Sequence, residues 1–229
     1  MIISHQYKFI FIKTRKTAGT SIEAFLSQVC AAEDVFTPVH PPLFGHQSRN
    51  YRGLFNPLAE FRVDRGMLAW ARTTKHLALR ERFYNHMPAR LVQLRLPPDV
   101  FNDYFKFCVE RNPWDKALSY YHMANHKAGG KLSLQKFVKR RQFSVDYPLY
   151  TDAQGRLLVD HVVRFENLTT QLGEVFVQLG IPFSGSLGVK AKGEYRQDRR
   201  PYQEVFTAEH RDIIARAYAS EIAMFNYQF

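Results

Sequence analysis

The sequence predicts an α/β fold with a mainly parallel central sheet flanked by helices. Two observations support this prediction. Short apolar runs alternate with segments of helical periodicity, and no linker, internal repeat or low-complexity tract interrupts them. At 229 residues the chain is long enough to bury one substantial core. We therefore expect a single domain that spans residues 1–229.

The first predicted unit is a strand over residues 7–12, then a loop and a helix. Residues 13–21 read K-T-R-K-T-A-G-T-S, and the small residues among them let consecutive backbone N–H groups converge on one anion. Thr20 and Glu23 match a capping box, and apolar residues recur at helical spacing behind them. The segment therefore predicts a P-loop-like, phosphate-binding strand–loop–helix.

The same loop lacks the signatures of two common nucleotide-binding classes. A Walker A loop ends in Gly-Lys followed by Ser or Thr, whereas the one Gly-Lys pair here, Gly130-Lys131, precedes Leu132. The Gly-x-Gly-x-x-Gly pattern of dinucleotide enzymes does not occur. An ordinary strand-to-helix turn with solvated basic residues is the alternative interpretation.

Two more strand–helix units follow. Residues 104–109 form an aromatic and β-branched run that is typical of a buried strand, Asn112 can cap the next helix, and Pro113 suits its first turn. A strand over residues 159–165 precedes an amphipathic helix over residues 168–179. Strands that alternate with helices in this way favour parallel pairing.

Arg111 lies where the second of these strands ends. Ligands of open α/β sheets bind at that edge, and an arginine fork matches the oxygens of a phosphate. Ser119, further along the helix, could add a hydroxyl donor. Pairing of Arg111 with a neighbouring carboxylate, Glu110 or Asp115, is the alternative interpretation.

These motifs resemble those of the sulfotransferases that use 3'-phosphoadenosine 5'-phosphosulfate, in particular their carbohydrate-type (family 2-like) branch. The family's first motif is an apolar strand followed by P-K-T-A-G-T-S, and here Arg15 takes the place of the proline. Its second motif, R-N-P-x-x-[RK]-x-x-S, matches residues 111–119 at every fixed position. The R-F-E-N-L of residues 164–168, the R-R-P-Y of residues 199–202 and a capped helix from about Thr207 also resemble the family.

The resemblance implies an enzyme that moves a sulfuryl group from 3'-phosphoadenosine 5'-phosphosulfate, its co-substrate, to an acceptor hydroxyl. We expect the acceptor to be a carbohydrate, a glycan or a small molecule, and no metal cofactor is implied. The loop would hold the 5'-phosphosulfate, while Arg111 and Ser119 would hold the 3'-phosphate. The predicted donor-binding residues are Lys13, Arg15, Lys16, Thr17, Ala18, Gly19, Thr20, Ser21, Arg111, Ser119, Arg199 and Arg200.

Sulfuryl transfer needs a base for the acceptor hydroxyl and a cation beside the leaving oxygen. Lys16 suits the cation. His86 is our candidate base, because Asn85-His86-Met87-Pro88-Ala89 resembles the His-x-x-Ala of many relatives and imidazole titrates near neutral pH. His46 and Glu166 are the alternatives.

Two further features were assigned on weaker patterns. Residues 36–57 are rich in proline, glycine and aromatic side chains, which predicts a long surface excursion and a candidate acceptor-side lid, or a loop without function. His122 and His126 stand four apart on a predicted helix and could face one ion, but the sequence shows no third ligand nearby. We therefore predict no metal site.

The charge balance calls for anionic partners. The chain has 32 basic and 21 acidic residues, a formal net charge of +11. A donor with phosphates and a sulfate fits this surplus. A basic nucleic-acid-binding protein, with its patch over residues 131–143, and a nucleotide-binding, kinase-like enzyme are the alternatives.

Cysteine usage and hydropathy bear on the compartment. Cys30 and Cys108 are the only cysteines and both lie in apolar surroundings, so no disulfide framework is expected. The N-terminal residues match neither a signal peptide nor a membrane span. We expect a bacterial, cytoplasmic protein without a membrane anchor.

Overall fold

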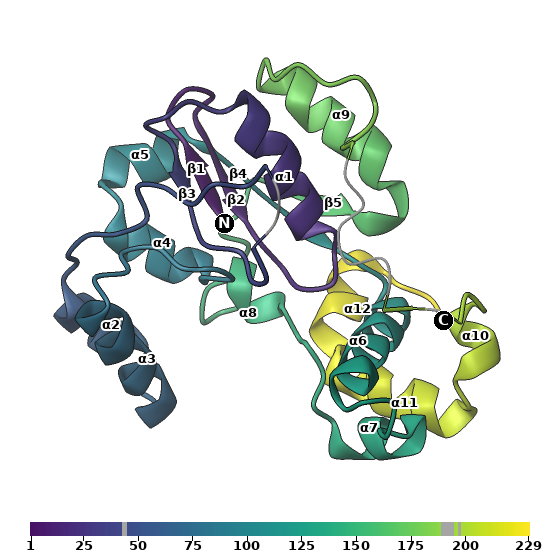
Figure 1. Cartoon of the computed structure of the whole chain (residues 1–229). Coiled ribbons are helices and arrows are strands. Elements are labelled where there is room, and N and C mark those ends of the chain that lie inside the picture. The colour runs from purple at the N-terminus through teal and green to yellow at the C-terminus, as the bar shows by residue number, and fades with distance from the viewer. Residues whose placement is uncertain (43–44, 189–194, 197) are drawn as a thin grey trace.

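A computed structural model describes residues 1–42, 45–188, 195–196 and 198–229. Its centre is a five-stranded mixed sheet with the strand order β3-β1-β2-β4-β5 (Figure 1). β2 pairs in parallel with β4, and β4 with β5, while β1 pairs antiparallel with both β2 and β3. The strands are β1 (Ile2–Ser4), β2 (Phe9–Ile12), β3 (Val35–Phe36), β4 (Phe105–Glu110) and β5 (His161–Arg164).

The α/β fold is confirmed, but the expectation of a mainly parallel sheet is correct for one half only. The three strands that precede predicted helices form the parallel half. The other half is antiparallel because β1 and β2 are joined by a short hairpin, and β3 then returns along β1. Short connections of this kind can only join antiparallel strands.

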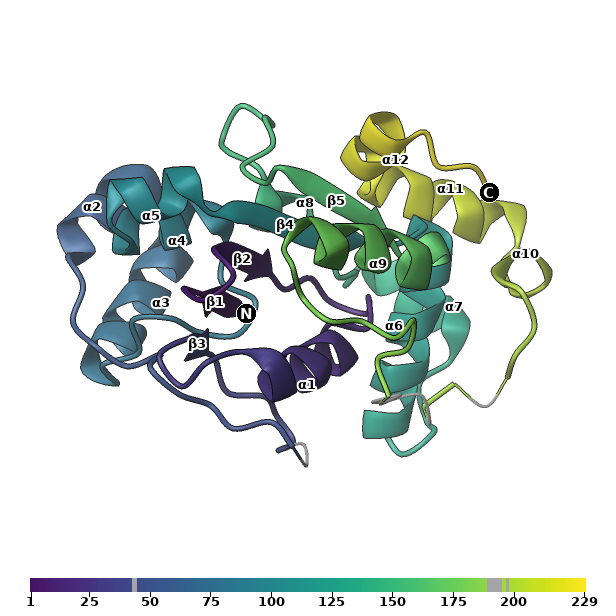
Figure 2. The same cartoon turned by 90° about the horizontal axis from the view of Figure 1, so that it is seen from above.

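Helices cover both faces of the sheet and form a separate group at one end of it (Figure 2). They are α1 (Gly19–Val29), α2 (Pro57–Val63), α3 (Met67–Ala78), α4 (Ala89–Arg95), α5 (Pro98–Asp103), α6 (Pro113–Lys127), α7 (Leu134–Arg140), α8 (Tyr147–Tyr150), α9 (Leu168–Gln178), α10 (Tyr202–Val205), α11 (Ala208–Ala217) and α12 (Ala219–Phe225), with a 3-10 turn at Phe165–Asn167.

The strands alternate their side chains between two apolar layers, as the period of two requires. Ile10 and Ile12 of β2 pack toward α4, α5 and α8, whereas Phe9 and Phe11 pack toward α1 and α9. A third apolar cluster joins α6, α7 and α11 around Trp114. The parallel strands therefore end between the packed sheet layers and the cluster of α6, α7 and α11.

Local signals in the sequence were correct at two helix starts and wrong at one. The Asn112 side chain accepts a hydrogen bond from the Trp114 N–H at 3.1 Å, and Thr207 accepts one from the His210 N–H at 3.3 Å. The predicted capping box of α1 does not form. Its N-cap is Ala18, which makes no side-chain cap, and Glu23 is used elsewhere.

The predicted excursion of residues 36–57 begins in β3 and ends where α2 starts, with residues 43–44 outside the described part. The described residues between them form isolated bridges, such as Phe36 with Arg49, and no helix or longer strand. α2 and α3 then form a helical hairpin that extends away from the sheet, on the side opposite α6 and α7 (Figure 1).

Candidate functional site

A cavity of about 440 Å³ opens where the parallel strands end, and we call it the first cavity. It lies between the loop after β2, the N-terminus of α1, the end of β4 and one side of α6. Its lining residues are Lys13, Thr14, Arg15, Lys16, Thr17, Ala18, Gly19, Thr20, Ser21, Asn85, His86, Arg111, Ser119, Tyr120, Met123, Lys127, Phe165, Arg196 and Arg199.

The loop backbone along this cavity has the geometry of an anion cradle. Lys16 and Ala18 have left-handed φ angles of 62° and 60°, while Thr17 between them does not. Such alternation turns successive N–H groups toward one point. Within the described residues, the N–H groups from Thr17 to Thr20 have no hydrogen-bond partner. They therefore form a cluster of donors at the positive end of the eleven-residue helix α1.

The loop is held from beneath by the sheet. The Thr14 hydroxyl donates to the Val109 carbonyl of β4 and lies 2.8 Å from the Thr17 hydroxyl. Because the Thr17 side chain is fully buried, its hydroxyl faces the protein interior. The Thr17 hydroxyl therefore supports the loop from within.

Arg15 is anchored to the buried Asp146. Its backbone N–H and its guanidinium each donate to this carboxylate at 2.7 Å. Lys116 lies 2.9 Å from the same carboxylate and 2.7 Å from Glu110. Burial opposes the charge of the Lys116 ammonium, but the two carboxylates outweigh it and raise its pKa. The loop is therefore tied to a buried network of charges.

Lys13 lines the first cavity, but its ammonium is paired with Glu23 on α1, and both side chains are buried. We expected this charge to meet a ligand, and the structure places it in an ion pair instead. The side chain crosses Gly19 so closely that a Cβ there would lie 2.8 Å from the Lys13 Cγ. Gly19 thus gives Lys13 the room to reach its partner.

Arg111 combines both interpretations made from the sequence. It lines the first cavity, and it also bonds Asp115 through Nε and Nη2 at 2.8 and 2.7 Å. Its Nη1 donates to the Lys16 carbonyl at 2.9 Å, and its guanidinium lies 4.1 Å from the centre of the Phe165 ring. These contacts fix the fork beside the loop.

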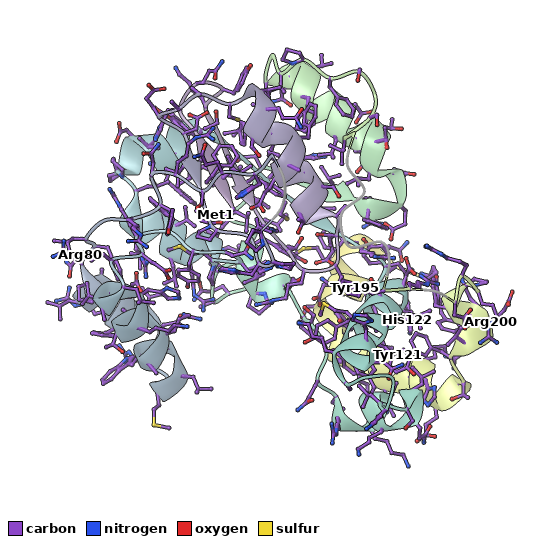
Figure 3. All side chains as sticks on the ribbon, viewed as in Figure 1. Met1, Arg80, Tyr121, His122, Tyr195 and Arg200 are labelled. Carbon is purple, nitrogen blue, oxygen red and sulfur yellow. The ribbon has the colours of Figure 1, made fainter. Side chains whose placement is uncertain are left out.

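A segment near the C-terminus supplies the opposite wall. Arg196 donates to Asp115 at 2.8 Å, and exposed Arg199 also lines the cavity. Arg200 pairs with Asp198. Of the predicted donor-binding residues, Arg200 alone is not among the described lining residues of the first cavity. Figure 3 shows Tyr195 and Arg200 on the α6 side of the molecule, and the Lys16 ammonium lies 5.7 Å from the centre of the Tyr195 ring.

Arg196 is not predicted from the sequence, although the structure places it as close to Asp115 as Arg111 is. Arg196 lies in no short motif, so the only sequence signal for it is the general surplus of basic residues. Ser119, by contrast, lies on the cavity side of α6, as its place in the second motif predicted.

His86 is joined to the loop. Its Nδ1 lies 2.9 Å from the Lys13 carbonyl oxygen, which can only accept, so Nδ1 carries the proton and Nε2 keeps a lone pair. Burial, reinforced by the nearby Lys13 charge, lowers the pKa of this imidazole to about 4. His86 is therefore neutral at neutral pH.

The two alternative bases lie elsewhere. Glu166 accepts a hydrogen bond from the Asn112 N–H at 2.6 Å, at the start of α6. His46 packs edge-on against Phe36, with 6.0 Å between ring centres. Neither residue is among those that line the cavities described here.

A second cavity, also about 440 Å³, adjoins the first, and Arg15, Asn85 and His86 line both. Its wall includes three buried polar atoms without a described partner, Arg72 Nε, the Tyr84 hydroxyl and Asn85 Oδ1. The other lining residues are Pro38, His40, Arg72, Lys75, His76, Leu79, Glu81, Tyr84, Pro88 and Leu149. Pro38 and His40 come from the predicted lid segment, which places part of that segment at this cavity.

The described residues contain no cluster of three or more His, Cys, Asp or Glu side chains arranged to hold a metal ion. His126, one of the two histidines spaced four apart on α6, packs against Tyr195, with 5.0 Å between ring centres. None of the described helices has the length and apolar character needed to cross a membrane.

The fold and the first cavity define an α/β protein in which a strand–loop–helix presents backbone N–H groups to a cavity. No family model matches the chain. An uncharacterized protein of Archaeoglobus fulgidus is 33% identical over 101 residues, which are 42% of this chain and 84% of that protein. The chain belongs to the same family as this archaeal protein.

Among solved structures, a sulfotransferase from Alicyclobacillus acidocaldarius is similar in fold. It covers 97% of this chain and 96% of its own, with a TM-score of 0.46 and 17% identity.

Proposed function

We propose that the protein is a sulfotransferase that moves a sulfuryl group from 3'-phosphoadenosine 5'-phosphosulfate to a hydroxyl of a carbohydrate or related acceptor. The observation that carries this proposal is the group of unpartnered N–H donors from Thr17 to Thr20, which shares a cavity with Arg111 and with a neutral histidine. Residues 1–229 as a single sulfotransferase domain stay a prediction.

The loop suits the phosphosulfate end of the donor. Backbone N–H groups at a helix N-terminus bind anions without the conformational cost of ordering long side chains. Lys16 on the same loop would stabilise the charge that grows on the oxygen bridging sulfur and phosphorus. Arg111, Ser119 and Arg199, on the other side of the cavity, would bind the 3'-phosphate.

His86 suits the base because it lines both cavities. An acceptor in the second cavity would give its hydroxyl proton to Nε2 as its oxygen bonds to sulfur and the bond from sulfur to the donor phosphate breaks. The products would be a sulfate ester and adenosine 3',5'-bisphosphate. A pKa of about 4 leaves Nε2 free to accept but weakly basic, so proton transfer must accompany bond formation.

Two measurements test the proposal. In competition binding by calorimetry, adenosine 3',5'-bisphosphate should outcompete ATP, because Arg111 and Arg199 offer a site for a 3'-phosphate. Labelled sulfate supplied on the donor should also appear on a hydroxyl-bearing compound when the protein is incubated with fractionated glycans and metabolites.

Tighter binding of ATP, with transfer of its terminal phosphate, would assign the loop to a kinase-like enzyme instead. Tight binding of nucleic acid without a preference for either nucleotide would favour the basic binding protein. Either result would remove the sulfotransferase proposal.

A further inference from the structure

The hairpin of α2 and α3 ends in an exposed apolar tip, which we define as residues 62–70. Met67 and Leu68 are 83% and 84% exposed, and Val63 and Trp70 are about half exposed. Scattered apolar side chains are normal on a protein surface, but a group of them at the end of a projecting hairpin marks an interaction site. The hairpin extends away from the sheet, so this tip is accessible (Figure 1).

The tip is also cationic. Arg62 and Arg65 are exposed, and neither forms an ion pair with any described residue. The one acidic residue of the tip, Asp64, is neutralised by two arginines, Arg72 at 2.6 Å and Arg90 at 3.0 Å. The partner of the tip must therefore be apolar and negatively charged.

We propose that the hairpin tip docks on an anionic membrane surface. Met67 and Leu68 would enter the boundary of the acyl chains, and Trp70 would lie at the headgroup level, where its amphipathic ring is favoured. Arg62 and Arg65 would contact the anionic headgroups. With twelve residues, α3 can only lie at the interface and cannot cross the bilayer.

A second copy of the chain fits the tip less well. The patch has only a few apolar side chains, whereas a stable interface buries roughly 800 Å² on each partner. A symmetric contact would also bring Arg62 and Arg65 of both copies together, and like charges at that distance repel. A membrane satisfies both the size and the charge of the patch.

The base of the hairpin is held independently of its tip. Buried Glu60 on α2 accepts hydrogen bonds from the Thr73 hydroxyl at 2.8 Å and from Arg95 Nη2 at 2.9 Å. These bonds tie α2, α3 and α4 together. Substitutions at the exposed tip should therefore leave the fold intact.

The test is cosedimentation with large vesicles of phosphatidylcholine, alone or mixed with phosphatidylserine. We expect the full chain to sediment with the mixed vesicles and not with phosphatidylcholine alone. Met67→Ser with Leu68→Ser, and separately Arg62→Glu with Arg65→Glu, should each weaken this binding by roughly tenfold or more.

Two matched controls separate a local site from the overall positive charge. Val177 on α9 is 81% exposed, so Val177→Ser removes an equally exposed apolar side chain elsewhere. Lys139→Glu with Arg140→Glu, on α7, changes the net charge as much as the tip charge variant does. Both controls should bind vesicles like the unmodified chain.

Three results would overturn the proposal. The first is absence of sedimentation with the mixed vesicles. The second is an equal loss for tip and control variants, because this would assign binding to the overall charge. The third is a dimer, seen by light scattering, that Met67→Ser with Leu68→Ser dissociates, because the tip would then be covered by a second copy.

Discussion

The two walls of the first cavity are built in different ways. The loop wall is fixed by buried groups: Thr14 bonds the Val109 carbonyl, and Arg15 bonds Asp146. The arginine wall, which we define as residues 195–196 and 198–200, is held by side chains nearer the solvent, such as Arg196 on Asp115. The loop amides are therefore positioned before any ligand arrives, while the arginine wall can exchange its present partners for a phosphate.

The largest expected effect tests the loop wall through His86. If the loop carbonyl of Lys13 orients this imidazole as the base, His86→Ala should lower sulfate transfer on the order of a hundredfold. Affinity for adenosine 3',5'-bisphosphate should stay unchanged, because His86 is not assigned to the nucleotide. Steady-state kinetics and calorimetry measure the two quantities. A variant with nearly full turnover would show that another group accepts the proton.

The pH profile sharpens the same test. The base must be neutral, and a pKa lowered to about 4 keeps nearly all of it neutral above about pH 5. Turnover should therefore stay constant between about pH 5.5 and 8, which is roughly the range where an ordinary histidine titrates. At pH values below about 5, turnover should decrease as the ring gains a proton. A rise in turnover through pH 6 to 7, around the usual histidine pKa of about 6.5, would contradict the buried environment that we assign to His86.

A smaller effect concerns the stability of the loop wall. Gly19→Ala would place a Cβ 2.8 Å from the Lys13 Cγ, so Lys13 would have to move from Glu23. We expect the free energy of unfolding to fall by about 1–3 kcal/mol, the usual cost of overpacking. Urea denaturation measures this change.

Gly66→Ala is the matched control, because Gly66 has an ordinary φ of −78° and open space around it. Because Gly66 is the N-cap of α3, where glycine is favoured over alanine, this variant should lose less than about 1 kcal/mol. Equal losses in both variants would show that the loop has no special need for glycine at position 19.

The smallest effect tests the arginine wall. Arg199→Ala should weaken binding of adenosine 3',5'-bisphosphate by roughly tenfold, the worth of one charge-assisted hydrogen bond. Its neighbour Arg200 pairs with Asp198 outside the cavity, so Arg200→Ala should leave binding unchanged. Calorimetry on both variants decides the assignment. If Arg200→Ala lost more nucleotide affinity than Arg199→Ala, Arg200 would have to leave Asp198 and enter the cavity when the nucleotide binds.

The sequence predicted the parallel half of the sheet because each of its strands is an apolar run followed by a helix signal. It did not predict β1 or β3, which have three and two residues. Strands this short show no periodicity, and their pairing with β2 and with each other depends on contacts that only the folded chain provides. The error of a mainly parallel sheet follows from that omission.

The same limit applies to the site. The motif positions Lys16, Arg111 and Ser119 all line the first cavity, and their binding of the donor stays a prediction. The sequence could not show that Lys13 faces inward, because its partner Glu23 had a plausible local use as a helix cap. Arg196 was missed because its link to Asp115 spans 81 residues.

The bond from Arg15 to Asp146 joins groups 131 residues apart, and the bond from Thr14 to Val109 joins groups 95 residues apart. Residues 13–21 are continuous in the sequence, yet the shape of their backbone depends on segments synthesised much later. The bonds that shape the loop cannot form until these distant partners have been made. The cradle is thus a product of the finished tertiary structure, and during biosynthesis an anion would find no shaped site there until most of the chain had been made.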